Sequence, residues 1–83
     1  MDRKKKRNPR FMGVVTKWNT ERGFGFIRSF EDDKQYYVNI RSIGEEEELI
    51  RGSIVEFEIW FVRDEEDKKF AAKVMVVELP EGN

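Results

Sequence analysis

Apolar and polar side chains alternate with a period of two along residues 53–62. The apolar members of this series are Val55, Phe57, Ile59 and Phe61. Successive side chains of a β-strand point to opposite faces of the sheet, so the pattern predicts a strand with one buried face. Trp60 falls on the other, polar face, where we expect it to cap a barrel or to mediate self-association. No stretch of the chain shows the 3.6-residue period of an amphipathic helix, and we expect an all-β fold.

Four further segments are rich in β-branched or aromatic residues and end at polar or glycine-containing breaks, which is typical of strands. They are residues 11–18, 23–27, 36–40 and 69–79. A charged loop is expected at 64–67, and 44–50 is expected to be a loop with a single turn. Five antiparallel strands in so short a chain predict a small closed barrel, because closure removes the edges that an open sheet exposes.

Composition excludes several classes of function. A chain of 83 residues forms one small domain that buries about 60% of its unfolded surface, which leaves little room for an enclosed active site. The absence of Cys and His excludes disulfides, thiolate nucleophiles, His-dependent triads and the usual zinc sites. No apolar run approaches the roughly 20 residues of a membrane span, and no secretory signal is recognisable. We therefore expect a cytoplasmic protein without catalysis, cofactor, metal, membrane association or small-molecule substrate.

Charge is distributed unevenly along the chain. Residues 1–29 hold nine of the 16 Lys and Arg residues but only two of the 17 acidic residues, while residues 30–83 hold seven basic and 15 acidic residues. This asymmetry indicates that the N-terminal part meets a polyanion while the rest is solvated. A basic tail and acidic loops that merely keep a small domain in solution explain the distribution equally well.

Residues 1–10 have no apolar periodicity and contain a proline, which predicts a disordered basic arm. Its basic residues are Arg3, Lys4, Lys5, Lys6, Arg7 and Arg10. A non-specific tether for a polyanion is favoured over a solubilising tail and a nuclear-import-like cluster. The import cluster is a weak interpretation because short basic runs are common. The expected organisation is therefore an arm at 1–10, a barrel at 11–79 and a flexible tail at 80–83.

The most informative motif is Arg-Gly-Phe-Gly-Phe-Ile, which begins at Arg22. Phe24 and Phe26 are two residues apart and share one face of a strand, whereas Ile27 falls on the opposite face and requires burial. Arg28 adds a second flanking positive charge. Exposed rings beside cations suit single-stranded nucleic acid, which needs flat surfaces for bases and positive charge for phosphates. Core packing of both rings is the alternative, and the flanking arginines argue against it.

The segment 13–27 resembles the opening of a cold-shock domain, which reads Gly-x-Val-Lys-Trp-Phe-Asn-x-x-Lys-Gly-Phe-Gly-Phe-Ile. Residues 36–40 are similar to the second motif of that family, and 52–59 and 71–74 are similar to its last two strands. The RNA-recognition-motif fold has the two motifs in the opposite order and needs two helices that are missing here. The resemblance, over about residues 12–78, implies a five-stranded antiparallel closed barrel of the oligonucleotide/oligosaccharide-binding (OB) type.

The resemblance also implies residue roles. Phe24 and Phe26 match the stacking aromatics of the second strand, and Tyr37 matches the one on the third, where it alternates with residues expected in the core. Trp18 stands one residue beyond the Trp of the family, whose place is taken by Lys17. A one-residue step turns a strand side chain to the opposite face, so a base contact by Trp18 depends on a local bulge.

Polar contacts follow from the same comparison. Asn39 replaces a His of the family, Ile40 replaces a Phe, and the loop at 44–48 is acidic where the family usually offers another aromatic. The expected polar and phosphate contacts are Lys17, Arg22, Arg28, Lys34 and Asn39. With Phe24, Phe26, Tyr37 and Trp18 as candidate stacking residues, we expect salt-sensitive binding of micromolar strength or weaker.

The resemblance implies that the protein binds single-stranded RNA or DNA with low specificity, as an RNA chaperone or a regulator of expression. We expect a monomer. The alternative is an OB barrel that serves as a protein-interaction module and has lost most of its affinity for nucleic acid. The missing Trp, His and loop aromatic and the acidic second half of the chain favour this alternative. A third hypothesis is that the chain is a regulatory or targeting module excised from a larger protein.

Overall fold

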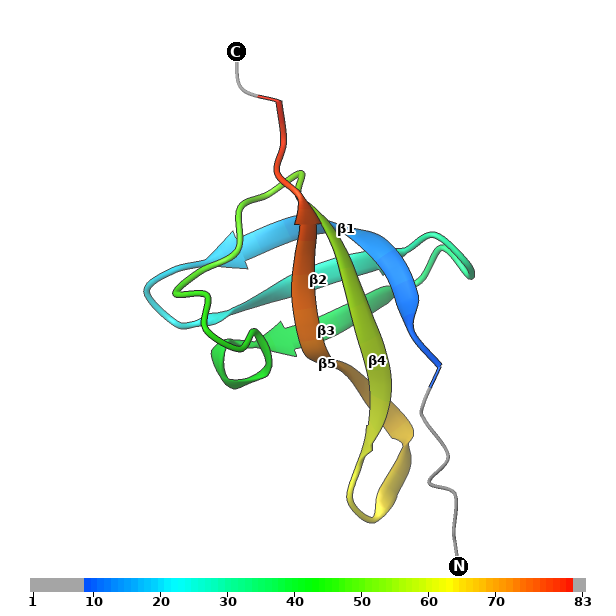
Figure 1. The fold of residues 1–83 in the computed structure, drawn as a ribbon. Coiled ribbons are helices and arrows are strands. Elements are labelled where there is room, and N and C mark those ends of the chain that lie inside the picture. The colour runs from blue at the N-terminus through cyan, green and yellow to red at the C-terminus, as the bar shows by residue number, and fades with distance from the viewer. Residues whose placement is uncertain (1–8, 82–83) are drawn as a thin grey trace, which may run out of the picture.

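The structure is a computed structural model, and it describes residues 9–81. Its elements are β1 (Phe11–Asn19), β2 (Phe24–Ser29), β3 (Gln35–Asn39), the 3-10 helix η1 (Ile40–Ser42), β4 (Ile54–Val62) and β5 (Glu65–Glu78). The strands close into a barrel in the order β1-β2-β3-β5-β4 (Figure 1). The predicted all-β closed barrel is therefore confirmed. Within 9–81, no helix is long and apolar enough to cross a membrane.

One pair of strands departs from the antiparallel expectation. β3 and β5 run parallel, with Tyr37 opposite Phe70 and Val38 opposite Ala71. The other neighbouring pairs of the barrel are antiparallel. Strand directions that alternate around a closed ring require an even number of strands. A five-stranded barrel must therefore contain at least one parallel pair, and the purely antiparallel prediction is wrong at this seam.

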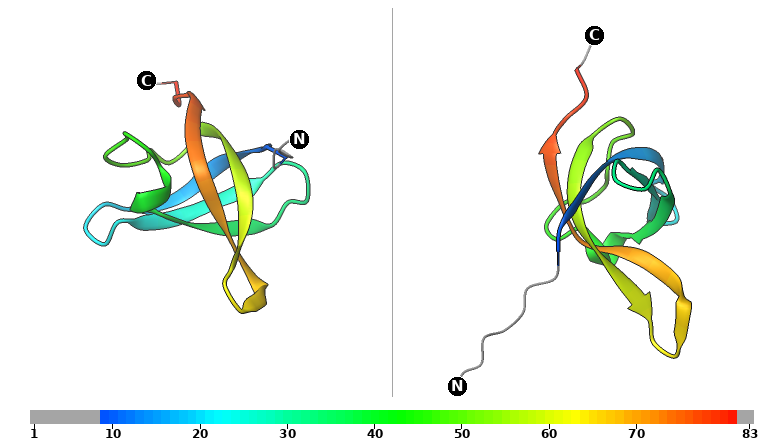
Figure 2. Two further views of the ribbon diagram at one scale, coloured as in Figure 1. Left: turned by 60° about the horizontal axis from the view of Figure 1, so that its bottom comes forward. Right: turned by 90° about the vertical axis from the view of Figure 1, so that its right-hand side faces the viewer.

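The inward-facing side chains of the strands, together with two residues of the long β3–β4 connection, form one core. Its buried members are Val15, Ile27, Tyr36, Val38, Ile43, Leu49, Val55, Phe57, Ala71 and Val74. The burial predicted for Ile27 and for the inward face of β4 is confirmed at Ile27, Val55 and Phe57. Phe61 departs from the pattern, because β4 and β5 continue beyond the barrel as a projecting hairpin and leave this ring 56% exposed (Figure 2).

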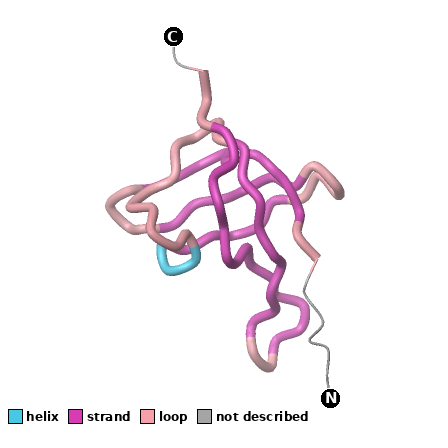
Figure 3. Tube along the Cα trace, in the orientation of Figure 1, coloured by secondary structure: helices cyan, strands magenta, loops and turns pink. Residues whose placement is uncertain are grey.

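Two local predictions need correction. β5 already begins at Glu65, so the tip of the hairpin is the two-residue turn 63–64 instead of a charged loop at 64–67. Asp64 adopts a left-handed backbone with φ of 65°, a conformation that Asp tolerates better than most residues. Residues 44–50 form a loop with a turn at 44–45, as predicted, and the backbone N–H of Glu46 donates to the carbonyl oxygen of Ile43 at 3.1 Å. The short 3-10 helix η1 precedes this loop, directly after β3 (Figure 3). Ile40 therefore belongs to η1 and not to the third strand.

A hydrogen bond closes the β2–β3 connection. The Tyr36 hydroxyl donates to Asp32 Oδ2 at 2.6 Å, and the backbone N–H of Lys34 donates to Asp32 Oδ1 at 3.0 Å. These bonds, that of Tyr36 first, lower the pKa of the Asp32 carboxyl below its ordinary 3.8. Burial, with the hydrogen bond to Asp32 and its charge, raises the pKa of Tyr36 to about 12.

Replacing Tyr36 with Phe is expected to lower the free energy of unfolding at neutral pH by about 1 kcal/mol, because it removes a hydrogen bond to an exposed carboxylate. The pKa of Asp32 is lower in the folded state than its ordinary value of 3.8, so the ionised carboxylate stabilises the fold at pH values above 3.8. This stabilisation is lost as the pH falls through the pKa of the folded state. The difference between the two proteins should therefore shrink in acid. Urea unfolding at neutral pH and at about pH 2.5 measures it.

The alkaline limb gives an independent check. The pKa of Tyr36 is higher in the folded state than its ordinary value of 10.0, so the protonated hydroxyl stabilises the fold at pH values below 10.0. This stabilisation is lost as the pH rises towards about 12. The natural chain should lose stability over this range that the Tyr36→Phe variant does not lose. If the difference in free energy of unfolding between the natural chain and the Tyr36→Phe variant stays constant from acid to alkaline pH, the pair of Tyr36 and Asp32 does not make stability depend on pH.

Candidate nucleic-acid interface

A β-bulge in β1 determines on which face of the sheet the side chains that follow Val15 lie. Val15 pairs with Ile27, but the next pair is Lys17 with Phe26, so Thr16 is the extra residue. Residues directly opposite each other in an antiparallel pair share a face of the sheet. The bulge therefore places Lys17 on the outer face beside Phe26 and turns Trp18 inward.

Trp18 lies on the inner face, opposite Gly25, and packs against the core. Its indole Nε1–H is buried without a hydrogen-bond partner among residues 9–81. A Cβ on Gly25 would stand 2.8 Å from Trp18 Cε3 and 2.1 Å from the carbonyl oxygen of Lys17, so only glycine fits here. The structure thus does not bring Trp18 together with the other candidate stacking residues.

Phe24, Phe26 and Tyr37 form one cluster on the outer face of β2 and β3, which we call the aromatic patch. Phe26 pairs directly with Tyr37 across the two strands. The ring of Tyr37 stacks on Phe24 with centroids 5.7 Å apart, and it meets Phe26 edge-on at 6.1 Å. None of the three rings belongs to the core cluster, and Tyr37 is 40% exposed. The predicted exposure of Tyr37 between buried Tyr36 and Val38 is confirmed.

Asn39 positions the patch from its edge. Its side chain lies opposite Phe24 in the β2–β3 pairing. Asn39 Nδ2 donates to the Tyr37 hydroxyl at 3.1 Å, and Asn39 Oδ1 accepts from the backbone N–H of Arg41 at 2.9 Å, which caps η1. Asn39 therefore holds the Tyr37 ring and links the patch to η1.

The predicted cations are spread unequally around the patch. Lys17 is exposed beside Phe26, and Arg22 lines a cavity that also includes Tyr37. Arg28 lies 3.4 Å from Asp33 in an exposed ion pair, which offsets part of its charge. Lys34 lines a separate cavity of about 270 Å³ with Tyr36. Lys17 and Arg22 thus border the aromatic patch, and Arg28 follows Phe26 on the same face of β2 with part of its charge offset.

The patch is also bordered by basic residues that the sequence analysis did not identify. A cavity of about 880 Å³ extends from Tyr37 and Asn39 to the β4–β5 hairpin. Its other lining residues are Arg22, Ile40, Arg41, Ser42, Val62, Asp67, Lys68, Lys69 and Phe70. Lys68 and Lys69 come next to the patch because β5 pairs with β3 in parallel, and Arg41 does so because η1 directly follows β3. The sequence analysis expected only antiparallel strand pairs and therefore did not place β5 beside β3. No local sequence pattern indicates this pairing.

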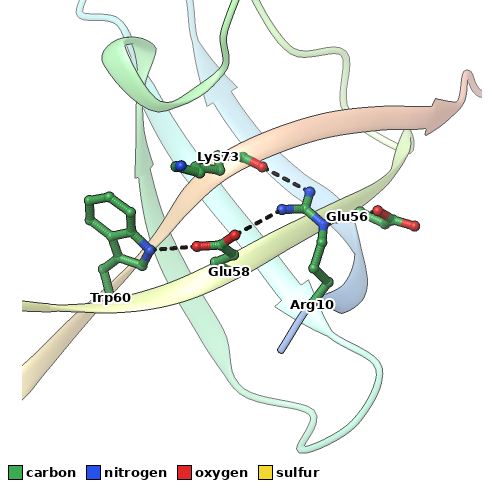
Figure 4. A network of polar contacts seen from close by, with 5 residues as sticks. All are labelled: Arg10, Glu56, Glu58, Trp60 and Lys73. Atoms are coloured by element: carbon green, nitrogen blue, oxygen red, sulfur yellow. Dashed lines mark hydrogen bonds and ion pairs between the residues drawn. The ribbon is translucent and has the colours of Figure 1, made fainter. Parts of the chain in front are cut away.

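The predicted basic arm is described only at its last residues. Arg3, Lys4, Lys5, Lys6 and Arg7 lie outside the described residues. Arg10 is described, and its guanidinium binds Glu56 Oε1 at 3.0 Å, Glu58 Oε2 at 3.4 Å and the carbonyl oxygen of Lys73 at 2.9 Å (Figure 4). This residue anchors the start of β1 to β4 and β5, so its charge is balanced there.

Comparison with known families agrees with this geometry. The chain matches the model of the "cold-shock" DNA-binding domain over residues 11–77. No curated protein gives a match to the chain. In the part of the chain that the structure describes, no group of three or more acidic side chains is arranged to hold a metal ion. Because the family match spans most of the sequence, the chain belongs to the cold-shock DNA-binding domain family, whose domains bind nucleic acid.

Proposed function

We propose that the domain binds single-stranded RNA or DNA with low sequence specificity by stacking bases on the aromatic patch. The observation that carries this proposal is the convergence of Phe24, Phe26 and Tyr37 on one outer surface, with Lys17 beside them. Every base has a flat face, so stacking tolerates many sequences. Lys17 and Arg22 are placed to meet phosphates, since single strands combine stacked bases with a charged backbone.

The affinity follows from the number of stacked bases. Each base stacked on an aromatic ring contributes roughly 1–3 kcal/mol, so three rings supply roughly 3–9 kcal/mol before the cost of ordering the strand. A micromolar dissociation constant corresponds to about 8 kcal/mol. Because Trp18 does not join the patch, the domain binds short single strands with micromolar affinity or weaker.

The role that fits this chemistry is that of an RNA chaperone or a regulator of expression. A domain that stacks exposed bases holds single strands open and needs no catalysis, cofactor or small-molecule substrate. Duplexes bind weakly, because their bases are stacked on each other and cannot reach the rings. We infer a monomer that acts in the cytoplasm, with the basic residues of the N-terminal arm as a non-specific tether.

A protein-interaction role is the second candidate, and one surface favours it. Met75, Val77 and Leu79 near the C-terminal end of the described chain are each more than half exposed. Exposed apolar side chains close together are typical of protein contacts. This surface belongs to β5 and the residue that follows it, whereas the patch belongs to β2 and β3, so the two roles can be separated by mutation.

Fluorescence anisotropy with labelled oligo-U and oligo-dT tests the proposed function. At physiological salt we expect a dissociation constant of micromolar strength or weaker, and at least about tenfold weaker binding of a duplex. The logarithm of the binding constant should fall linearly with the logarithm of the salt concentration, by about 0.7 for each phosphate neutralised. A nanomolar constant at physiological salt, or equal affinity for the duplex, would overturn the proposal.

A further inference from the structure

Trp60 lies on β4 where this strand leaves the barrel, and its side chain is 39% exposed. The indole meets Phe70 edge-on with centroids 6.2 Å apart, and Lys73 Nζ lies 5.8 Å from the ring centroid. Trp60 Nε1 donates to Glu58 Oε1 at 2.8 Å (Figure 4). The ring is not a member of the core cluster, and Glu58, Phe70 and Lys73 contact it at the surface.

The indole lines a cavity of about 290 Å³. The other lining residues are Arg41, Ser42, Gly44, Phe70, Ala72 and Lys73. Two aromatic side chains and two cations thus surround this space, and none of its described lining residues is acidic. This combination suits a nucleotide, because the base needs an aromatic surface and its phosphate needs positive charge.

The cavity at Trp60 adjoins the cavity that reaches the aromatic patch. Arg41, Ser42 and Phe70 line both this cavity and the one of about 880 Å³ that reaches Tyr37. Among the described side chains that line the larger cavity, Arg22, Arg41 and Lys69 accompany Asp67, while Lys68 is paired with Glu65 at 3.2 Å. A strand that leaves the patch at Tyr37 therefore meets a basic path that ends at a second aromatic surface.

The backbone at this surface is held in an unusual conformation. Lys73 has a left-handed φ of 51°, which side chains with a Cβ rarely adopt. Arg10 donates to its carbonyl oxygen at 2.9 Å, and the β4–β5 pairing is irregular between Glu56 and Glu58. Strained residues persist where their surroundings fix them, and they gather at functional sites. Here the strain accompanies an ammonium group placed over Trp60.

The acidic neighbour of Trp60 does not oppose an anionic ligand at full strength. Glu58 lies 3.4 Å from the Arg10 guanidinium, which it shares with Glu56 at 3.0 Å and which offsets part of its negative charge. Glu58 Oε1 accepts the indole N–H, so the carboxylate lies at the edge of the ring and leaves the faces of the ring to Lys73 and to a ligand.

We propose that Trp60 is a second stacking site for a longer single strand. The strand stacks bases on the aromatic patch, crosses the cavity at Arg41 and places a further base on Trp60, with a phosphate near Lys73. This proposal rests on the proposed function, because it requires that the patch itself binds a single strand. It goes beyond that function by assigning the hairpin a part in binding and by making affinity depend on strand length.

The test compares oligo-U of about four and about twelve nucleotides, both within the range of about 4 to 16 nucleotides that OB folds occupy. Trp60→Ala is expected to weaken binding of the longer strand by about 5- to 150-fold, the loss of one stacked base, and to leave the shorter strand unaffected. Phe61→Ala is the matched control, because Phe61 is the neighbouring exposed aromatic of the same hairpin on its opposite face. This control should bind both strands as the natural chain does.

A second readout keeps the test decisive if Trp60→Ala fails to fold. Of the two indole N–H signals in the NMR spectrum, the one from Trp60 should shift with the longer strand only, while that of Trp18, whose Nε1 is buried, stays nearly unchanged. Trp60→Phe, which keeps an aromatic face, should retain most of the affinity for the longer strand.

Three results would overturn the proposal. Equal affinities of Trp60→Ala and the natural chain for the longer strand, with intact binding of the shorter one, would refute the second site and leave the proposed function standing. Absence of binding by the natural chain to either strand would remove both. A Trp60 signal that shifts with protein concentration and not with oligonucleotide would assign this surface to contact between copies of the chain.

Discussion

Replacing Phe24 and Phe26 together with Ala is expected to weaken binding of a short oligo-U or oligo-dT by at least about 30-fold. Each stacked base contributes about 1–3 kcal/mol, and the double variant removes two of the three rings of the patch. With a starting affinity of micromolar strength or weaker, the remaining binding should fall close to the detection limit of anisotropy or calorimetry.

The fold should survive this change, because neither ring belongs to the core cluster. Phe30→Ala is a suitable control, since Phe30 is 55% exposed just after the end of β2 and is not part of the patch. Circular dichroism and thermal melting should show folded domains in both variants. Unchanged affinity of a folded double variant would mean that nucleic acid does not stack on Phe24 and Phe26.

The largest loss of stability is expected from Gly25→Ala. The new Cβ would stand 2.1 Å from the carbonyl oxygen of Lys17 and 2.8 Å from Trp18 Cε3. The first of these atoms is backbone and cannot move without opening the β1–β2 pairing at the bulge. We expect a loss of about 3 kcal/mol or more in the free energy of unfolding, which corresponds to a drop of at least about 12 °C in Tm for a domain of this size.

Gly44→Ala separates this steric effect from the conformational preference of glycine. Gly44 has a left-handed φ of 65°, and nothing lies within 4 Å of the position of its Cβ. This variant should lose only about 1 kcal/mol, the cost of placing a side chain in the left-handed region. Thermal melting of both variants measures the comparison. Similar melting temperatures for Gly25→Ala and Gly44→Ala would show that Trp18 and Lys17 do not fill the space in front of Gly25.

Local pattern is sufficient to predict most of the barrel and the membership of the patch. Alternation along a strand reports which side chains share a face, so the sequence alone places Val55 and Phe57 inside and Tyr37 outside, as the fold has them. The same rule places Phe24 and Phe26 on one face of their strand. These features depend only on neighbours in the chain, which is why a single sequence contains them.

The features that the sequence did not reveal depend on how strands meet. The bulge at Thr16 reverses the faces of Lys17 and Trp18, and a bulge has no fixed signature in the residues that form it. The parallel pairing of β3 with β5 follows from closure of an odd number of strands. That pairing brings Lys69 to the edge of the patch, and it could not be expected from a pattern that assumed antiparallel neighbours.

The most direct test of stacking on the patch is a heteronuclear NMR titration of the isotope-labelled chain with a short oligo-U or oligo-dT, at low and then at physiological salt. We predict shifts centred on Phe24, Phe26 and Tyr37 that persist at physiological salt and disappear in the folded Phe24→Ala, Phe26→Ala double variant. Shifts confined to residues 3–10 and erased by salt, or no shifts at all, would contradict the proposal that the aromatic patch binds single-stranded nucleic acid.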